Sequence, residues 1–136
     1  MARESIAMSA DEMAEFVGAK KWIVLGTLDE DASPRGDVVA SLLDGERLIF
    51  SVSRGTRASA NIERDARVVC MTDQYPAYYE IKGVTAHGRA EREENASLAE
   101  RLPADPLDGK TADRQTYAIP LDDVTSFDFT KINAKL

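Results

Sequence analysis

The chain has 136 residues, of which 43% are hydrophobic and 30% are charged, and its formal net charge is -7. This length and composition predict one compact soluble domain over residues 1–136, because no apolar run approaches the roughly 20 residues that a membrane-spanning helix needs. The acidic charge argues against a nucleic-acid partner and the N-terminal stretch lacks the apolar core of a secretory signal, so we expect a cytoplasmic protein with no nucleic-acid partner and no membrane partner.

The first predicted element is a short helix in the stretch "SADEMAEFVGAK". Ser9 is a typical N-cap residue, and Glu12 stands three positions later, where its side chain can reach back to form a capping box. Met13, Phe16 and Val17 then fall on one side of the helix. The pattern predicts an amphipathic helix with one buried face.

Runs rich in β-forming residues, separated by turn residues, predict a mainly β domain. The expected strands span residues 21–29, 34–43, 47–53, 67–73 and 77–91, followed by a final strand pair at 115–121 and 124–132. In the run 47–53, Leu48, Phe50 and Val52 share one face, so this strand is expected to be half buried. About six short strands joined by tight turns favour a small closed antiparallel barrel.

Two further helices and one close approach are expected around these strands. Thr56 can cap a helix whose Ala58 and Ile62 face inward, and a second amphipathic helix is predicted over residues 93–102. Gly83, inside a predicted strand, marks a bulge or a point where another group comes close to the backbone.

The stretch "SRGTRASAN", residues 53–61, concentrates cations and hydrogen-bond donors where a strand meets a helix. The N-terminus of a helix presents unpaired N–H groups and a partial positive charge, so it suits a phosphate. Arg57 can form a bidentate hydrogen bond with phosphate oxygens, and Arg54 adds a second positive charge. Ser53 and Thr56 supply neutral donors. The alternative is a solvated turn in which Thr56 only caps a helix.

Three stretches follow one another in a characteristic order: "PRGDVVASLL", then "DGERLIFSVSRGTRASANIERDARVVCM", then "YYEIKGVTAHGRAE". In this order they resemble the FMN-binding split-barrel family, which includes pyridoxamine phosphate oxidases, small bacterial FMN-binding proteins and deazaflavin-dependent reductases. The resemblance spans residues 10–92. It implies a six-stranded antiparallel split β-barrel with short flanking helices, FMN as the cofactor, and a homodimer with the flavin at the subunit interface.

The resemblance also implies which residues hold the cofactor. The ring would lie along Gly36, Asp37, Val38 and Val39, and the phosphate would be held by Ser51, Val52, Ser53, Arg54, Thr56 and Arg57. Gln74, in the stretch "DQYPAYY", is added as part of a possible ring wall. Pyridoxamine phosphate oxidases carry an arginine at the position of Asp37 and a lysine at that of Ala58, so the small FMN-binding proteins match the chain better.

The function implied is that of an FMN-dependent oxidoreductase acting on a small-molecule redox partner, and no side chain stands out as a catalytic acid or base. The alternatives are an FMN-binding electron carrier or sensor, a deazaflavin-dependent reductase, and a barrel without a cofactor. Cys70 is expected to be a small core residue and His87 a surface or interface residue. With one cysteine and one histidine in the chain, no metal site is expected.

Overall fold

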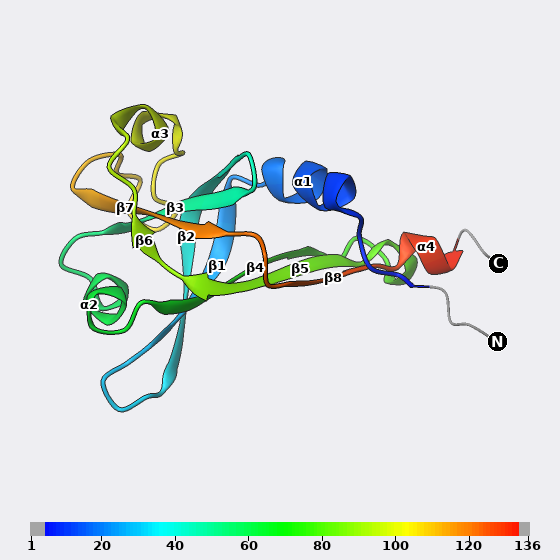
Figure 1. Ribbon diagram of the computed structural model, residues 1–136, viewed down its shortest axis with the longest axis horizontal. Coiled ribbons are helices and arrows are strands. Elements are labelled where there is room, and N and C mark those ends of the chain that lie inside the picture. The colour runs from blue at the N-terminus through cyan, green and yellow to red at the C-terminus, as the bar shows by residue number, and fades with distance from the viewer. Residues whose placement is uncertain (1–4, 134–136) are drawn as a thin grey trace.

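The computed structural model describes residues 5–133, which form one antiparallel sheet of eight strands with short helices around it (Figure 1). The strands are β1 (Trp22–Leu28), β2 (Pro34–Asp44), β3 (Arg47–Ser53), β4 (Arg67–Gln74), β5 (Lys82–Arg89), β6 (Glu91–Arg92), β7 (Arg114–Pro120) and β8 (Val124–Asp128). Their order in the sheet is β6-β7-β3-β2-β1-β4-β5-β8. The predicted fold class is confirmed, although the strand count is eight and not six.

The sheet curls into a split barrel because the chain changes pairing partners at two places, within β2 and between β5 and β6. The first part of β2 pairs with β1, and its last residues pair with β3. On the far side, β8 pairs only with residues 82–86 of β5, and the chain passes through Ala90 into β6, which pairs with β7. The segment β5–β6 therefore joins the two halves of the sheet. The strand that was not expected as a separate element is this continuation, β6, while β8 corresponds to the expected strand 124–132.

Two of the helices begin at the predicted caps. Before α1 (Ala10–Gly18), Ser9 Oγ accepts the Glu12 N–H at 3.2 Å and the Ser9 N–H donates to Glu12 Oε1 at 2.9 Å, a complete capping box. Thr56 Oγ1 accepts the Ser59 N–H at 3.3 Å at the start of α2 (Arg57–Arg64). The remaining helices are α3 (Ala96–Arg101), the single-turn 3-10 helix η1 (Tyr78–Glu80) and α4 (Thr130–Asn133). None of the helices within residues 5–133 is long and apolar enough to cross a bilayer.

Two predicted strands are shorter than expected. The expected strand 77–91 starts only at Lys82, because the residues before it form η1, and it is interrupted at Ala90. The expected strand 124–132 ends at Asp128, whose Oδ1 accepts the Thr130 N–H at 2.9 Å and so turns the chain into α4.

The prediction that β3 is half buried was wrong, since both of its faces are covered. Leu48, Phe50 and Val52 lie in the barrel core, and Ile49 lies in a second apolar cluster with Leu98 of α3. The sequence alternates as a one-sided strand does, but a helix from later in the chain covers the other side. The close approach predicted at Gly83 is confirmed, because a Cβ there would lie 2.5 Å from Phe127 Cζ.

One buried hydroxyl lies in this core without a partner. Ser41 on β2 is 2% exposed, and its Oγ has no hydrogen-bond partner among residues 5–133. Burial has removed its water contacts without compensation, so we expect Ser41→Ala to raise the free energy of unfolding by about 1 kcal/mol. Urea denaturation of the two proteins measures this difference, and a loss of stability would contradict the expectation.

Candidate functional site

One pocket gathers residues from both halves of the predicted flavin site. We call it the strand–helix pocket. It is lined by Asp37, Val38 and Val39 of β2, Val52 and Ser53 of β3, Thr56 and Ala58 at the start of α2, and Asp105, Leu107 and Asp108 of the loop that precedes β7. Its volume is about 110 Å³. The predicted ring strand and the predicted phosphate-binding turn therefore meet in space, although they are separated in the sequence.

The inner walls of the strand–helix pocket are apolar. Val39, Val52 and Ala58 are all buried. The remaining predicted residues of these strands, Gly36 and Ser51, do not line the pocket; Ser51 is 2% exposed and pairs with Thr116 of β7. Such walls suit a flat apolar group held against the backbone of β2.

The start of α2 supplies hydrogen-bond donors at the rim of this pocket. The Thr56 hydroxyl donates to Ser53 O at 2.7 Å and accepts the Ser59 N–H, which fixes the first turn. Among residues 5–133, the N–H groups of Arg57 and Ala58 form no hydrogen bond. Free N–H groups and the helix dipole together attract an anion.

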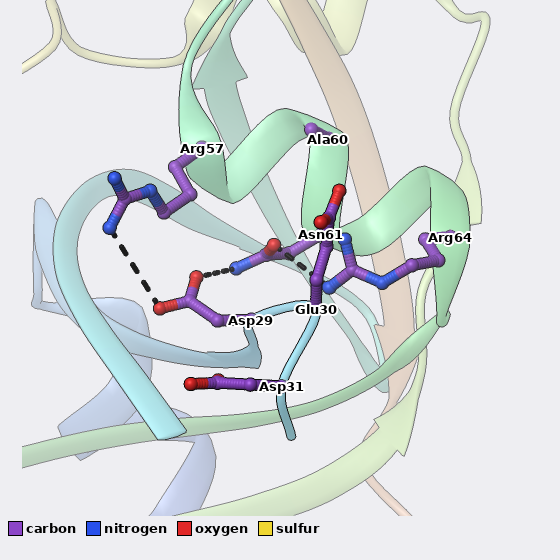
Figure 2. A pocket seen from close by; sticks show the side chains of 7 residues that line it. All are labelled: Asp29, Glu30, Asp31, Arg57, Ala60, Asn61 and Arg64. Atoms are coloured by element: carbon purple, nitrogen blue, oxygen red, sulfur yellow. Dashed lines mark hydrogen bonds and ion pairs between the residues drawn. The ribbon is translucent and has the colours of Figure 1, made fainter. Parts of the chain in front are cut away.

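The two arginines of the turn do not point into the strand–helix pocket. The Arg57 guanidinium is directed at the turn between β1 and β2, where its NH1 lies 4.0 Å from Asp29 Oδ2, and its side chain is 66% exposed (Figure 2). Arg54 NH2 donates to Gln115 Oε1 at 3.4 Å and to Arg114 O at 3.5 Å. Both are solvent-exposed neighbours of the helix start.

Carboxylates line the same pocket. Asp37 accepts from Arg35 Nε at 3.1 Å, so its charge is paired within β2. The Ser53 hydroxyl lies 3.3 Å from Asp105 Oδ2 and 3.4 Å from Asp108 Oδ2. Sequence reasoning missed these two aspartates. The stretch "PADPLDGKTAD" has the Pro, Gly and Asp content of a loop, and nothing in it indicates which strand the loop folds against.

Gln74 lies far from the other predicted site residues. It ends β4 beside η1, and its Nε2 donates to Glu80 O at 3.4 Å. Figure 1 shows η1 and α2 at opposite ends of the molecule. Tyr75, Tyr78 and Tyr79 of the same stretch are exposed. Within one chain, the predicted ring wall therefore does not face the strand–helix pocket.

An exposed apolar row crosses the outer face of the sheet. Val24 of β1 pairs with Val38 of β2 on one side and with Met71 of β4 on the other. The exposed fractions of these three residues are 40%, 41% and 39%, and Trp22 on the same face of β1 is 48% exposed. We call Trp22, Val24, Val38 and Met71 the apolar sheet face.

A second, open pocket of about 500 Å³ lies between α2 and the β1–β2 turn (Figure 2). Asn61 forms its floor and is 1% exposed. The Asn61 side-chain amide donates to Thr27 Oγ1 at 3.0 Å and to Asp29 Oδ1 at 2.8 Å, and its Oδ1 accepts from Arg64 NH2 at 3.0 Å. The bonds to Thr27 and Asp29 hold α2 against β1 and the turn that follows it.

Cys70 and His87 occupy the kinds of position expected for them. Cys70 is 2% exposed in the barrel core, and burial raises the pKa of its thiol to about 12. His87 is exposed on β5 and lies beside Val69 of β4. Within residues 5–133, no group of three or more His, Cys, Asp or Glu side chains is placed to hold a metal ion.

The Cys70 thiol should be unreactive in the folded protein, because the reactive thiolate is scarce near neutral pH when the pKa is about 12 and the sulfur is covered. We expect a colourimetric thiol reagent at pH 8 to label less than a tenth of the protein in the time that labels the urea-unfolded chain completely. Labelling at equal rates in the two states would contradict the burial of this side chain.

Comparisons with known proteins agree with this architecture. Residues 9–135 match the sequence family described as pyridoxamine 5'-phosphate oxidase. No curated protein matches the chain. A crystal structure of a conserved hypothetical protein from Mycobacterium tuberculosis is similar with a TM-score of 0.80 and 21% identity, covering 98% of this chain and 92% of that one.

Two further solved structures are similar at lower identity. The FAD binding protein from Mycobacterium smegmatis has a TM-score of 0.67 and 14% identity, and the likeness covers 88% of this chain and 95% of that one. A putative pyridoxamine 5'-phosphate oxidase from Corynebacterium glutamicum has a TM-score of 0.67 and 12% identity, covering 93% and 94%. At these identities the likeness is one of fold. The family match over residues 9–135 shows that the chain belongs to the pyridoxamine 5'-phosphate oxidase family.

Proposed function

We propose that this protein binds FMN in the strand–helix pocket and acts as an FMN-dependent oxidoreductase. The observation that carries the proposal is the convergence of Asp37–Val39 of β2 with the Ser53–Ala58 turn around one pocket. The family match and the similarity to an FAD binding protein support a flavin as the cofactor. A bound flavin would supply hydride or electron transfer, while the protein orients it and limits its contact with water.

The residues around the pocket fit both the ring and the phosphate of the cofactor. The backbone of β2 and the buried side chains of Val39 and Val52 offer an apolar wall for the ring. The N–H groups of Arg57 and Ala58 offer a place for the phosphate, and the exposed Arg57 side chain has the freedom to turn toward an anion there.

A second copy of the chain is part of the proposal. The strand–helix pocket has about 110 Å³, well below the roughly 300 Å³ at which small-molecule sites begin. Gln74 and its neighbouring tyrosines lie at the other end of the molecule, so only a partner chain brings them to this pocket. Val38 belongs to both the apolar sheet face and the pocket. Burial of the apolar sheet face in a homodimer would therefore place the flavin at the interface.

The visible absorption spectrum of the purified protein, before and after addition of FMN and desalting, tests cofactor binding. We expect retained bands of oxidised flavin. Retention of a deazaflavin alone would favour a deazaflavin-dependent reductase, and retention of no flavin would overturn the proposal. Continuous oxidation of a reduced nicotinamide with a panel of acceptors then distinguishes an enzyme from an electron carrier, which is reduced only once per bound flavin.

Light scattering of the protein tests the homodimer. We expect the mass of two chains for the wild type and of one chain for Val24→Lys, because the lysine places a charge at the centre of the apolar sheet face. Thr125→Lys, at an exposed position on β8 at the end of the sheet order, is the matched control and should remain dimeric. A wild-type monomer that binds FMN at full strength would contradict the shared site.

A further inference from the structure

The loop between α3 and β7 crosses the rim of the strand–helix pocket and presents two carboxylates to it. Asp105 is 9% exposed, and Asp108 and Leu107 line the pocket beside it. Arg114, the first residue of β7, attaches the loop to the barrel, because its NH1 donates to Pro103 O at 2.6 Å. The position of these carboxylates is therefore built into the fold.

The conformation of the loop holds each carboxylate in place. Asp105 Oδ1 accepts the Leu107 N–H at 2.8 Å, and the Gly109 N–H donates to Asp105 O at 2.8 Å. Asp108 Oδ1 accepts the Lys110 N–H at 2.8 Å. In both aspartates, one oxygen is used within the loop and the other faces Ser53.

The Ser53 hydroxyl cannot satisfy both aspartates. It carries one hydrogen, and the two carboxylate oxygens lie at similar distances of 3.3 and 3.4 Å. The nearby guanidinium of Arg114 is directed to main-chain carbonyls, and that of Arg35 is paired with Asp37. Two negative charges therefore lie beside Ser53 and close to the N-terminus of α2, the place proposed for the phosphate.

We infer that Asp105 and Asp108 set the phosphate selectivity of this pocket by occupying Ser53 and repelling a dianion. This inference rests on the proposed flavin function. The aspartates compete with the phosphate for the Ser53 hydroxyl and for the helix start, so the phosphate of FMN binds against their repulsion. Riboflavin, which has the same ring and no phosphate, binds without that repulsion.

The test compares the Kd values of FMN and riboflavin, measured by fluorescence titration of the full chain at constant salt. Asp105→Asn, Asp108→Asn and the double variant keep an oxygen acceptor for the loop N–H groups and remove the charge. We expect the double variant to bind FMN about tenfold more tightly than the wild type, with the riboflavin Kd changed less than twofold. Asp108→Asn alone, at an exposed position, keeps the test valid if Asp105→Asn does not fold.

Asp113→Asn is the matched control, because Asp113 is exposed at the end of the same loop and does not line the pocket. Its φ of 56° is one that asparagine tolerates. The control should leave the ratio of the two Kd values unchanged. If both flavins bind and the ratio of their Kd values is the same in the wild type and the double variant, the inference is overturned and the proposed function stands. Failure of every variant to bind either flavin would overturn the proposed function as well.

Discussion

Replacement of Asn61 with alanine is expected to lower the free energy of unfolding by about 3 kcal/mol. The Asn61 side chain is 1% exposed and joins three partners through hydrogen bonds of 2.8 to 3.0 Å. Alanine would leave Thr27 and Asp29 without their shared donor and would open a small cavity between α2 and β1. Urea denaturation followed by circular dichroism measures the loss.

Ser59→Ala is the matched control for this prediction. Ser59 lies on the same helix and is partly buried, and the hydrogen bond to Thr56 uses its main-chain N–H, which alanine retains. We expect its free energy of unfolding to change by less than about 0.5 kcal/mol. A similar small change for Asn61→Ala would show that the bonds drawn in Figure 2 contribute little to the position of α2.

Arg57→Ala is expected to weaken FMN binding by about thirtyfold, or about 2 kcal/mol, because it removes a charge-assisted fork from the phosphate. The fold should be unaffected, since the guanidinium is 66% exposed and lies 4.0 Å from its carboxylate partner. Riboflavin has no phosphate, so its Kd should change little. Fluorescence titrations with both flavins give the ratio of the FMN Kd to the riboflavin Kd, which measures the contribution of the phosphate to binding.

Two further arginine variants control for charge. Arg101→Ala removes an exposed arginine from α3, away from the strand–helix pocket, and should leave both Kd values unchanged. Arg54→Ala should weaken FMN binding less than Arg57→Ala, because Arg54 donates to the β7 segment and is exposed. If Arg57→Ala leaves the ratio of the FMN Kd to the riboflavin Kd unchanged, the stretch 53–61 is a solvated turn and the phosphate binds elsewhere.

The features that the sequence predicted correctly depend on residues close together in the chain. Ser9 with Glu12 indicates a capping box, and Thr56 indicates the start of α2, because a cap bonds to N–H groups within a few residues. Gly83 was also recognised, since glycine inside a strand marks a close approach. The order of strand, turn and helix was enough to indicate the family and the split barrel.

The features that could not be predicted depend on contacts between distant segments. The buried outer face of β3 follows from Leu98 of α3, and the acidic rim of the pocket follows from Asp105 meeting Ser53. The structure directs the Arg57 side chain toward Asp29, and its role at the phosphate stays a prediction. Local composition cannot show which loop comes to lie against which strand, or which of two neighbours an exposed arginine contacts.

The pairing of β3 with β7 has a consequence for how this chain is made. Phe50 lies opposite Tyr117, so one edge of β3 has no partner until most of the sequence has left the ribosome. Pairings between such distant segments form slowly, and an apolar strand with an open edge is prone to join another chain meanwhile. We therefore expect fragments of this sequence that end before β7 to aggregate.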